Sequence, residues 1–232
     1  MKKVGDFWLP DIDLRRLSKW GKTRRKTLER YGQGRGPKPD DLAEALALFE
    51  GGEVAIDGGA NVGAYTRILL ERFATVYAFE PAPDTYEALS RNIEDWGFKD
   101  RVRLHPFALS DRVEKVRLRG KFGHRSLSRR ITGKGDIPTM RIDDLELQEL
   151  DFIKLDLEGY EVRALHGARE TLSKHRPFVL FEDKPHKAEL YGESREAHSF
   201  LESLGAKLIA RVGKSQFDWM YGFPQVQESV AK

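Results

Sequence analysis

Short runs of apolar residues alternate along the chain with longer stretches in which apolar residues recur every three or four positions. Apolar runs of about five residues, bounded by glycine, proline or charged residues, are typical of buried strands. This pattern predicts strands over residues 53–57, 75–79, 101–105, 152–156, 177–181, 207–212 and 216–221. The wider spacing predicts helices over residues 11–31, 40–49, 62–73, 84–96, 160–172 and 194–204. The basic stretch that follows residue 105 is expected to be irregular.

Regular alternation of strands and helices predicts an α/β fold, with a doubly wound, mostly parallel sheet and helices on both of its faces. The last two predicted strands are joined only by the short Gly-Lys-Ser turn of residues 213–215. A turn of that length connects antiparallel strands, so the C-terminal end should form an antiparallel hairpin. Residues 1–39 are predicted to be a basic helix and a Gly/Pro-rich linker, and residues 40–232 one domain.

Charge is distributed unevenly around the net value of +3. Residues 1–38 hold twelve Lys and Arg against four Asp and Glu, and residues 112–134 hold nine against one. Two basic segments on an otherwise acidic chain suggest local contact with an anionic molecule. The alternative is that these side chains only solvate a surface helix and a loop.

The composition excludes several classes of protein. The chain has no cysteine, which excludes disulfides, thiolate metal sites and a cysteine nucleophile. No run of about 18 apolar residues is present, and the first residues do not have the pattern of a secretory signal. We therefore expect a cytoplasmic protein without a transmembrane segment.

A glycine-rich turn follows the predicted strand 53–57 and precedes a predicted helix. Glycines let the backbone approach a ligand closely, and free amides at a helix start favour polar or anionic groups. The G-x-G-x-x-G spacing of dinucleotide-binding proteins is absent, and an acid opens the turn. An acid there would repel a pyrophosphate but would attract a sulfonium and an amino group, which favours S-adenosylmethionine (SAM) over NAD. The candidate cofactor-binding residues are Asp57, Gly58, Gly59, Ala60, Asn61 and Gly63.

A second acid, Glu80, follows the predicted strand 75–79, and both Glu80 and the next residue, Pro81, are candidate cofactor-binding residues. A carboxylate in this position can accept hydrogen bonds from both ribose hydroxyls of a nucleotide. The alternative is that it only lies near the start of the next helix. The stretch 105–110 follows the third strand and should border the same crevice, where it could hold an adenine.

Further carboxylates follow the strands predicted over 152–156 and 177–181. Asp156 is expected to contact the reacting end of the cofactor and of the substrate. It is also the first candidate for a general base, followed by Glu158 and then Glu182. Lys154 should face the same side as Asp156, either as a structural ion pair or as a substrate contact. A divalent metal held by Asp156, by Glu182 or Asp183, and by His186 is possible but not favoured.

The ensemble of motifs resembles the FkbM family of SAM-dependent methyltransferases. The motifs occur in family-like order between residues 53 and 182, as IDGGANVG, YAFEPAPDTYEALSRNI, ALSD, IDDL, DFIKLDLEGYEVRALHGA and FVLFE. The resemblance implies the Rossmann-like class I methyltransferase fold and methyl transfer to a hydroxyl of a sugar, glycan or secondary metabolite. It also implies that Glu80 contacts the ribose of SAM and Ala108 its adenine, while the methionine end is lined by Asp57, Gly59, Asn61 and Gly63. Asp156, Glu158 and Gly159 match the acidic motif of the family.

The basic insert occupies the place of a serine-containing substrate loop in the family. The candidate substrate-binding residues are His124, Arg125, Ser126, Arg129 and Lys154. The arginines, with Arg130 and Lys134, could hold an anionic part of the acceptor. Three alternatives stay open: a nucleic-acid methyltransferase that uses the basic segments, a non-catalytic glycan- or RNA-binding module, and an NAD oxidoreductase. The oxidoreductase is disfavoured by the glycine spacing.

Overall fold

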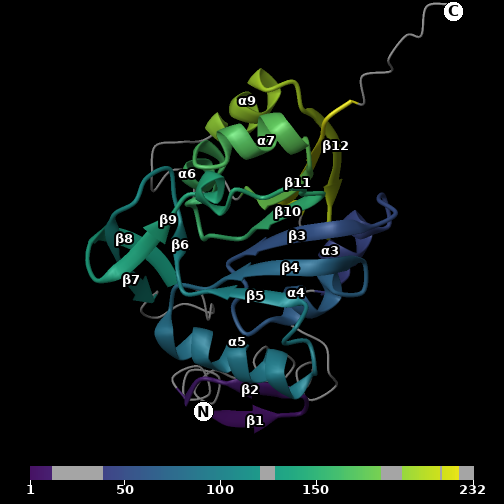
Figure 1. Cartoon of the computed structure of the whole chain (residues 1–232). Helices are drawn as coiled ribbons and strands as arrows, with labels where there is room; N and C mark the ends of the chain where they lie inside the picture. Colours follow the sequence, from purple (N-terminus) through teal and green to yellow (C-terminus); the bar gives the residue numbers. More distant parts are fainter. Residues whose placement is uncertain (12–38, 121–128, 184–194, 215, 225–232) are drawn as a thin grey trace, which may run out of the picture.

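A computed structural model describes residues 1–11, 39–120, 129–183, 195–214 and 216–224 of the chain. Its main feature is a twisted central sheet of seven strands with helices on both faces, which confirms the predicted α/β architecture (Figure 1). The strands of this sheet are β3 (Gly52–Gly58), β4 (Phe73–Phe79), β5 (Val102–His105), β10 (Phe152–Leu155), β11 (Phe178–Glu182), β12 (Lys207–Val212) and β13 (Asp218–Gly222). The helices are α3 (Pro39–Leu46), α4 (Ala64–Leu69), α5 (Pro83–Asp95), α6 (Glu161–His166), α7 (Arg169–His175) and α9 (Glu196–Ser203), with a 3-10 turn η1 (Ile142–Leu145).

The strand order of the central sheet is β12-β13-β11-β10-β3-β4-β5. Strands β5, β4, β3, β10 and β11 are parallel, whereas β13 is antiparallel to both β11 and β12. The predicted C-terminal antiparallel hairpin is therefore confirmed. The order reverses between β3 and β10, and in open parallel sheets ligands bind outside the carboxyl ends of the strands at such a switch point.

Successive residues of the central strands pack into two separate cores. Ala55 and Phe152 belong to one core, which includes residues of α3, α4 and α5, while the next residues Ile56 and Ile153 belong to the other. That second core includes residues of α6, α7 and α9. Since side chains alternate between the faces of a strand, strands apolar on both faces must be covered on both sides.

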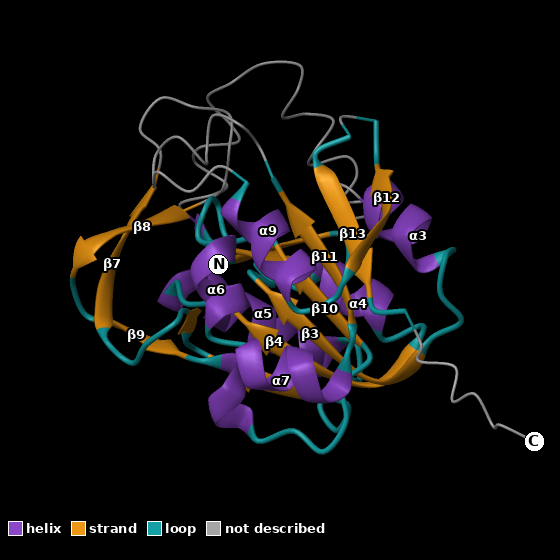
Figure 2. Ribbon diagram, turned by 90° about the horizontal axis from the view of Figure 1, so that it is seen from above, coloured by secondary structure: helices purple, strands orange, loops and turns teal. Residues whose placement is uncertain are grey.

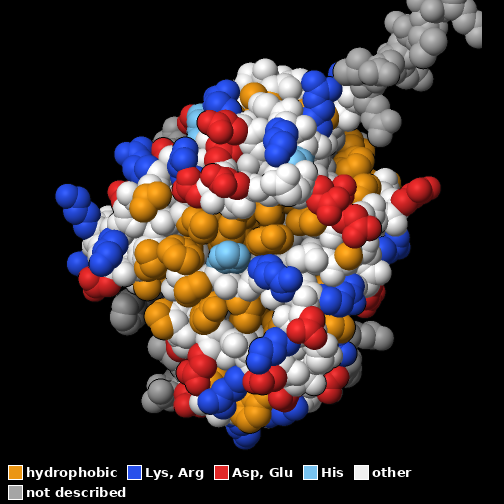
Figure 3. All heavy atoms as spheres, in the orientation of Figure 1, with side chains coloured by type: hydrophobic (Ala, Val, Ile, Leu, Met, Phe, Trp, Pro, Cys, Tyr) orange, Lys and Arg blue, Asp and Glu red, His pale blue; other side chains and the backbone are white. Residues whose placement is uncertain are grey.

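Among the described residues, helices cover the sheet face seen in Figure 1 only in part. Figure 3 shows apolar side chains gathered in the middle of the face seen in Figure 1, between α6–α7 and α5. The rings of Tyr77 and Phe79 stack on the His105 imidazole, with centroid distances of 5.8 and 4.6 Å. This stack places the His105 ring over β4, and burial lowers its pKa.

The segment after β5 is not irregular, which corrects the sequence-based expectation. It forms a second sheet of order β6-β9-β7-β8, which stands at one end of the central sheet (Figure 2). Its strands are β6 (Ala108–Leu109), β7 (Lys115–Gly120), β8 (Arg129–Lys134) and β9 (Ile137–Met140). In β7 the exposed Lys115, Arg117 and Arg119 alternate with Val116 and Leu118, which pack inward. This alternation of charged and apolar residues is typical of a strand with one face exposed to solvent, but the high charge of the segment obscures it.

A two-stranded hairpin precedes the segment that was predicted to begin with a helix at residue 11. Strands β1 (Lys2–Val4) and β2 (Phe7–Leu9) pair antiparallel and pack on α5 (Figure 1). Phe7 is 1% exposed and meets Trp96 edge to face at 5.0 Å. The predicted basic helix and linker lie outside the described residues, and the domain boundary at residue 39 stays a prediction.

The helix predicted over 160–172 is divided into α6 and α7. The break occurs at Gly167, where a Cβ would lie 2.0 Å from the Ser110 carbonyl oxygen. The backbone of the second sheet therefore approaches the helix where only a glycine fits. In the described part of the chain, none of the helices has the length and apolar character needed to cross a lipid bilayer.

Candidate active site

The glycine-rich loop of residues 58–63 joins β3 to α4 at the switch point. The amides of Gly59 and Ala60 donate to the Phe79 carbonyl at 3.0 and 2.9 Å. Gly59 has a φ of 76°, and a Cβ there would lie 2.2 Å from the Asp156 carbonyl oxygen. Only glycine tolerates both conditions. The loop therefore turns tightly between the ends of β4 and β10.

Asp57 lies beneath this loop with no exposed surface. Its Oδ2 accepts a hydrogen bond from Thr66 Oγ1 at 2.6 Å, and its Oδ1 lies 3.2 Å from Lys154 Nζ. Lys154 Nζ also lies 3.4 Å from the Gly58 carbonyl oxygen. Burial alone would lower the pKa of Lys154, but attraction by Asp57 and Asp156 raises it above its ordinary value. The Lys154 ammonium therefore connects β10 to Asp57 and Gly58, where the loop begins. Direct contact of Asp57 with a ligand stays a prediction.

Glu80 connects the glycine loop to the start of α5. Its Oε2 accepts from the Asn61 amide at 3.0 Å and its Oε1 from the Ala82 amide at 2.9 Å. Each carboxylate oxygen has a second lone pair, which leaves acceptor capacity for two ligand hydroxyls. Burial raises the pKa of Glu80 to about 7, although the two amides and the charge of Arg129 oppose that increase. Burial thus makes the ionised form of Glu80 less favourable, and strongly shifted pKa values of this kind are typical of functional sites.

A small polar cavity adjoins the loop at the carboxyl ends of β10 and β11. It is lined by Asp41, Leu42, Tyr65, Lys154, Leu155, Asp156, Leu180, Glu182 and Asp218. The structure thus brings together Asp156 and Glu182, the first and third candidates for a general base, with Lys154 beside them. Their elements converge because parallel strands end at the same edge of a sheet.

Tyr65, in the first turn of α4, supplies the aromatic wall of this cavity. The Lys154 ammonium lies 4.5 Å from its ring centroid, a distance typical of a cation–π contact. Burial, followed by repulsion from Asp156 and Asp218, raises the pKa of Tyr65 well above its ordinary range. The phenol is therefore protonated at neutral pH and can donate a hydrogen bond, but it cannot serve as a base.

Two predicted acids lie elsewhere. Glu158 occupies the turn after β10 with a φ of 59° and does not line the cavity. Asp183 follows the last residue of β11 and does not line the cavity; its Oδ2 lies 2.9 Å from His198 Nε2. His186 lies outside the described residues. Among the residues that the structure describes, no group of three or more His, Asp or Glu is arranged to hold a metal ion.

The predicted substrate contacts are only partly described. His124, Arg125 and Ser126 lie outside the described residues. Arg129 forms a two-pronged ion pair with Asp84 in the first turn of α5, so its guanidinium is already paired next to Glu80. Contact of Arg129 with an acceptor stays a prediction.

Two predicted cofactor residues occupy different surroundings. Ala108 is buried in a small cluster with Val116 and Ile131 of the second sheet and with Tyr160, which precedes α6. Pro81 lies in the turn that Glu80 braces through the Ala82 amide. Their contacts with a cofactor stay predictions.

Sequence reasoning missed Asp41, Tyr65 and Asp218. Asp218 pairs in register with Glu182 across β11 and β13. The terminal hairpin was predicted, but its register, which places Asp218 beside Glu182, could not be predicted from the sequence. Asp41 and Tyr65 lie on helices that give no local signal of a site.

The strand order and the glycine loop at its switch point define a class I methyltransferase fold. Residues 57–208 match the family model described as the methyltransferase FkbM domain. The chain therefore belongs to the FkbM methyltransferase family, as its motifs predicted.

Two relatives give more specific comparisons. The chain is 30% identical over 149 residues to the 2-O-methyltransferase NoeI of Sinorhizobium fredii, covering 53% of this chain and 60% of NoeI. It is 28% identical over 149 residues to the hexuronic acid methyltransferase AglP of Haloferax volcanii, covering 62% and 61%. The match thus spans about 60% of the length of these curated relatives.

Solved structures support the fold. Methyltransferase FkbM from Methylobacillus flagellatus superposes with a TM-score of 0.54 at 21% identity, covering 87% of this chain and 54% of that one. SMU.1697c from Streptococcus mutans, solved in complex with SAH, gives a TM-score of 0.52 at 12% identity, covering 80% and 97%. At these identities the likeness concerns the fold alone.

Proposed function

We propose that this methyltransferase uses SAM to methylate a hydroxyl oxygen of a sugar or of a related polyhydroxylated acceptor. Three features at one switch point of the sheet support the proposal. They are a glycine loop, a carboxylate that can accept hydrogen bonds from ribose hydroxyls, and a cavity lined by acidic side chains. The names of NoeI and AglP support the acceptor class, since one is a 2-O-methyltransferase and the other acts on a hexuronic acid.

The donor groups of the site fit SAM. Glu80 would accept from the ribose hydroxyls, and the backbone of the loop from Gly59 to Gly63 would approach the methionine end. The carboxylates of the cavity favour a cationic sulfonium nearby, because unlike charges attract strongly where water is scarce. When bound, SAM supplies a methyl group that is already activated for transfer.

The protein's part is to orient the acceptor and to move its proton. Asp156 lies at the end of β10 beside the loop, where its carboxylate can take the proton of the attacking hydroxyl. Glu182 is a second acceptor for that proton in the same cavity. Tyr65, which stays protonated, would donate a hydrogen bond to a ligand oxygen and help to exclude water.

The cavity favours the uncharged, hydroxyl-bearing part of an acceptor. Asp41, Glu182 and Asp218 can accept hydrogen bonds from sugar hydroxyls, while Lys154, the cationic side chain that lines the cavity, is paired with Asp57. A carboxylate or phosphate on the acceptor would be repelled there. Any such group would instead face the basic strand β7 of the second sheet, where Lys115, Arg117 and Arg119 are exposed.

This exposed basic strand also favours a second candidate, a nucleic-acid methyltransferase. The two functions differ in their response to salt, because binding to phosphates releases counterions and weakens steeply as salt rises.

Methyl-labelled SAM tests both candidates. The enzyme is incubated with methyl hexosides, hexuronic acids and total RNA, and label is counted in each product. Transfer to sugar oxygens that is lost in Asp156→Asn supports the proposal. Transfer to RNA alone, weakened strongly by salt, would replace it with the second candidate.

A further inference from the structure

One buried side chain, Asn92 of α5, connects the N-terminal hairpin to the glycine loop. Its Nδ2 donates to the Val62 carbonyl oxygen at 2.8 Å and to the Trp8 carbonyl oxygen at 3.1 Å. Its Oδ1 accepts from the Trp8 amide at 2.6 Å. Asn92 has no exposed surface, so these hydrogen bonds satisfy an amide that water cannot reach.

The partner in the loop is a position where the backbone is unusual. Val62 lies between Asn61, with a φ of 53°, and Gly63, with a φ of 93°. Asparagine adopts the left-handed conformation more readily than other residues with side chains, but less readily than glycine, so hydrogen bonds from its surroundings help to hold it. Glu80 holds the loop through the Asn61 amide, and Asn92 holds it through the next carbonyl.

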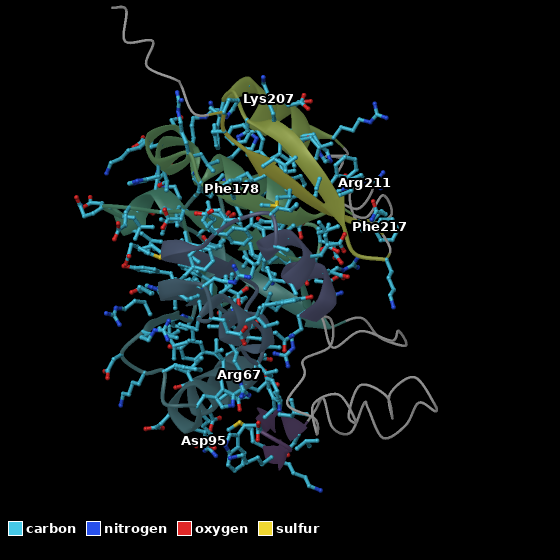
Figure 4. The ribbon with its side chains drawn as sticks, turned by 90° about the vertical axis from the view of Figure 1, so that its right-hand side faces the viewer. Arg67, Asp95, Phe178, Lys207, Arg211 and Phe217 are labelled. Carbon is cyan, nitrogen blue, oxygen red and sulfur yellow. The ribbon has the colours of Figure 1, made fainter. Side chains whose placement is uncertain are left out.

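The hairpin also supports the loop by packing. Phe7, Leu9, Val62 and Ala88 form one apolar cluster, in which two hairpin residues cover a loop residue. Arg67 of α4 lies 5.0 Å from the Trp96 ring and 3.6 Å from an Asp6 carboxylate oxygen. Figure 4 shows Arg67 and Asp95 on the elements that lie next to the hairpin.

We propose that Asn92 is a positioning residue for the cofactor loop and that the hairpin of residues 2–9 is a working part of the cofactor site. Residues 2–9 lie outside the family match at 57–208, so this support is supplied by a part of the chain that the family model does not include. The inference rests on the proposed use of SAM. Without Asn92 or the docked hairpin, the free loop would sample other conformations, and binding would have to restore the competent one.

The test compares variants that separate loop support from general stability. Asn92→Asp keeps the shape but replaces the two donors by an acceptor, and Phe7→Ala loosens the hairpin without changing α5. Glu87→Ala is the matched control on the same helix: it removes the exposed ion pair between Glu87 and Arg91, which lies within α5. SAM affinity is measured by calorimetry well below each melting temperature, together with hydrogen exchange of the amides of residues 61–63.

We expect Asn92→Asp and Phe7→Ala to weaken SAM binding about tenfold and to increase exchange in the loop, since a net hydrogen bond corresponds to about that factor. Glu87→Ala should leave both the affinity and the exchange of the loop amides unchanged. Wild-type affinity in a folded Asn92→Asp or Phe7→Ala protein would overturn the inference. If Asn92→Asp does not fold, the SAM affinity of Phe7→Ala alone decides whether the inference holds. Absence of SAM binding by the wild type would refute the proposed function instead, whereas wild-type binding with unaffected variants refutes only this inference.

Discussion

Acidification should weaken SAM binding through one residue, Glu80. Its pKa is raised to about 7 by burial, so the free protein takes up a proton there near neutral pH. The protonated carboxyl loses part of its capacity to accept hydrogen bonds from the ribose hydroxyls and from the Asn61 and Ala82 amides. SAM should therefore bind the deprotonated form more tightly, and its affinity should fall as the pH decreases.

The magnitude follows from the pKa. If the ribose restores an ordinary carboxylate pKa in the complex, the dissociation constant should rise about tenfold from about pH 8 to about pH 6. The stability of the free protein should change in the opposite direction. The pKa of Glu80 is higher in the folded than in the unfolded chain, so its stabilising contribution is present below the unfolded value of about 4.5 and is lost as the pH rises through about 7. Over the same two pH units, the free energy of unfolding should change by about 1.4 kcal/mol through this residue.

Calorimetric titration with SAM across this pH range tests the prediction, with Glu80→Gln as the control. The variant keeps the other titratable groups, so its affinity should be lower at high pH and nearly independent of pH. Urea unfolding of both proteins without SAM measures how the free energy of unfolding changes with pH. An equal wild-type affinity at both ends of the range, or the same pH dependence in Glu80→Gln, would refute the reasoning.

Three further variants test separate parts of the site. Asp156→Asn should keep SAM affinity within a few-fold in calorimetry but lose turnover by about a hundredfold or more in the labelled-methyl assay, because it cannot take the hydroxyl proton; surviving turnover would make Asp156 structural. Lys154→Met should lower the free energy of unfolding by about 3–5 kcal/mol in urea titration, because it leaves the Asp57 carboxylate buried without its cation. The double variant with Asp57→Asn should recover part of this loss, and no recovery would contradict the pairing. Gly59→Ala should abolish measurable SAM binding, since its Cβ would lie 2.2 Å from a backbone oxygen; wild-type affinity would show that the loop can rearrange.

The sequence predicted the middle of the central sheet well because strands such as β10 and β11 are buried on both faces. It predicted the second sheet poorly, because β7 carries Lys115, Arg117 and Arg119 on one face, and charge obscured the alternation with its apolar residues. The hairpin of residues 2–9 was missed for a related reason. Its two strands have three residues each and gain their stability from α5, which lies far away in the sequence.

The partners within the site depend on register, which local pattern does not determine. Lys154 and Asp156 lie two residues apart, so the sequence placed them on the same side of a strand. The sheet, however, pairs Lys154 directly with Asp57 across β10 and β3. The candidate residues could therefore be named from motifs, whereas their partners required the fold.

Calorimetric titration of the full chain with SAM, repeated with NAD, tests the central claim most directly. A glycine loop with left-handed turns, a buried Glu80 and an acid-lined cavity should bind SAM with micromolar affinity and leave NAD unbound. Saturable heat with SAM alone is the predicted result. Binding of NAD in place of SAM, or no binding of SAM at all, would contradict the assignment of this site as the cofactor site of a methyltransferase.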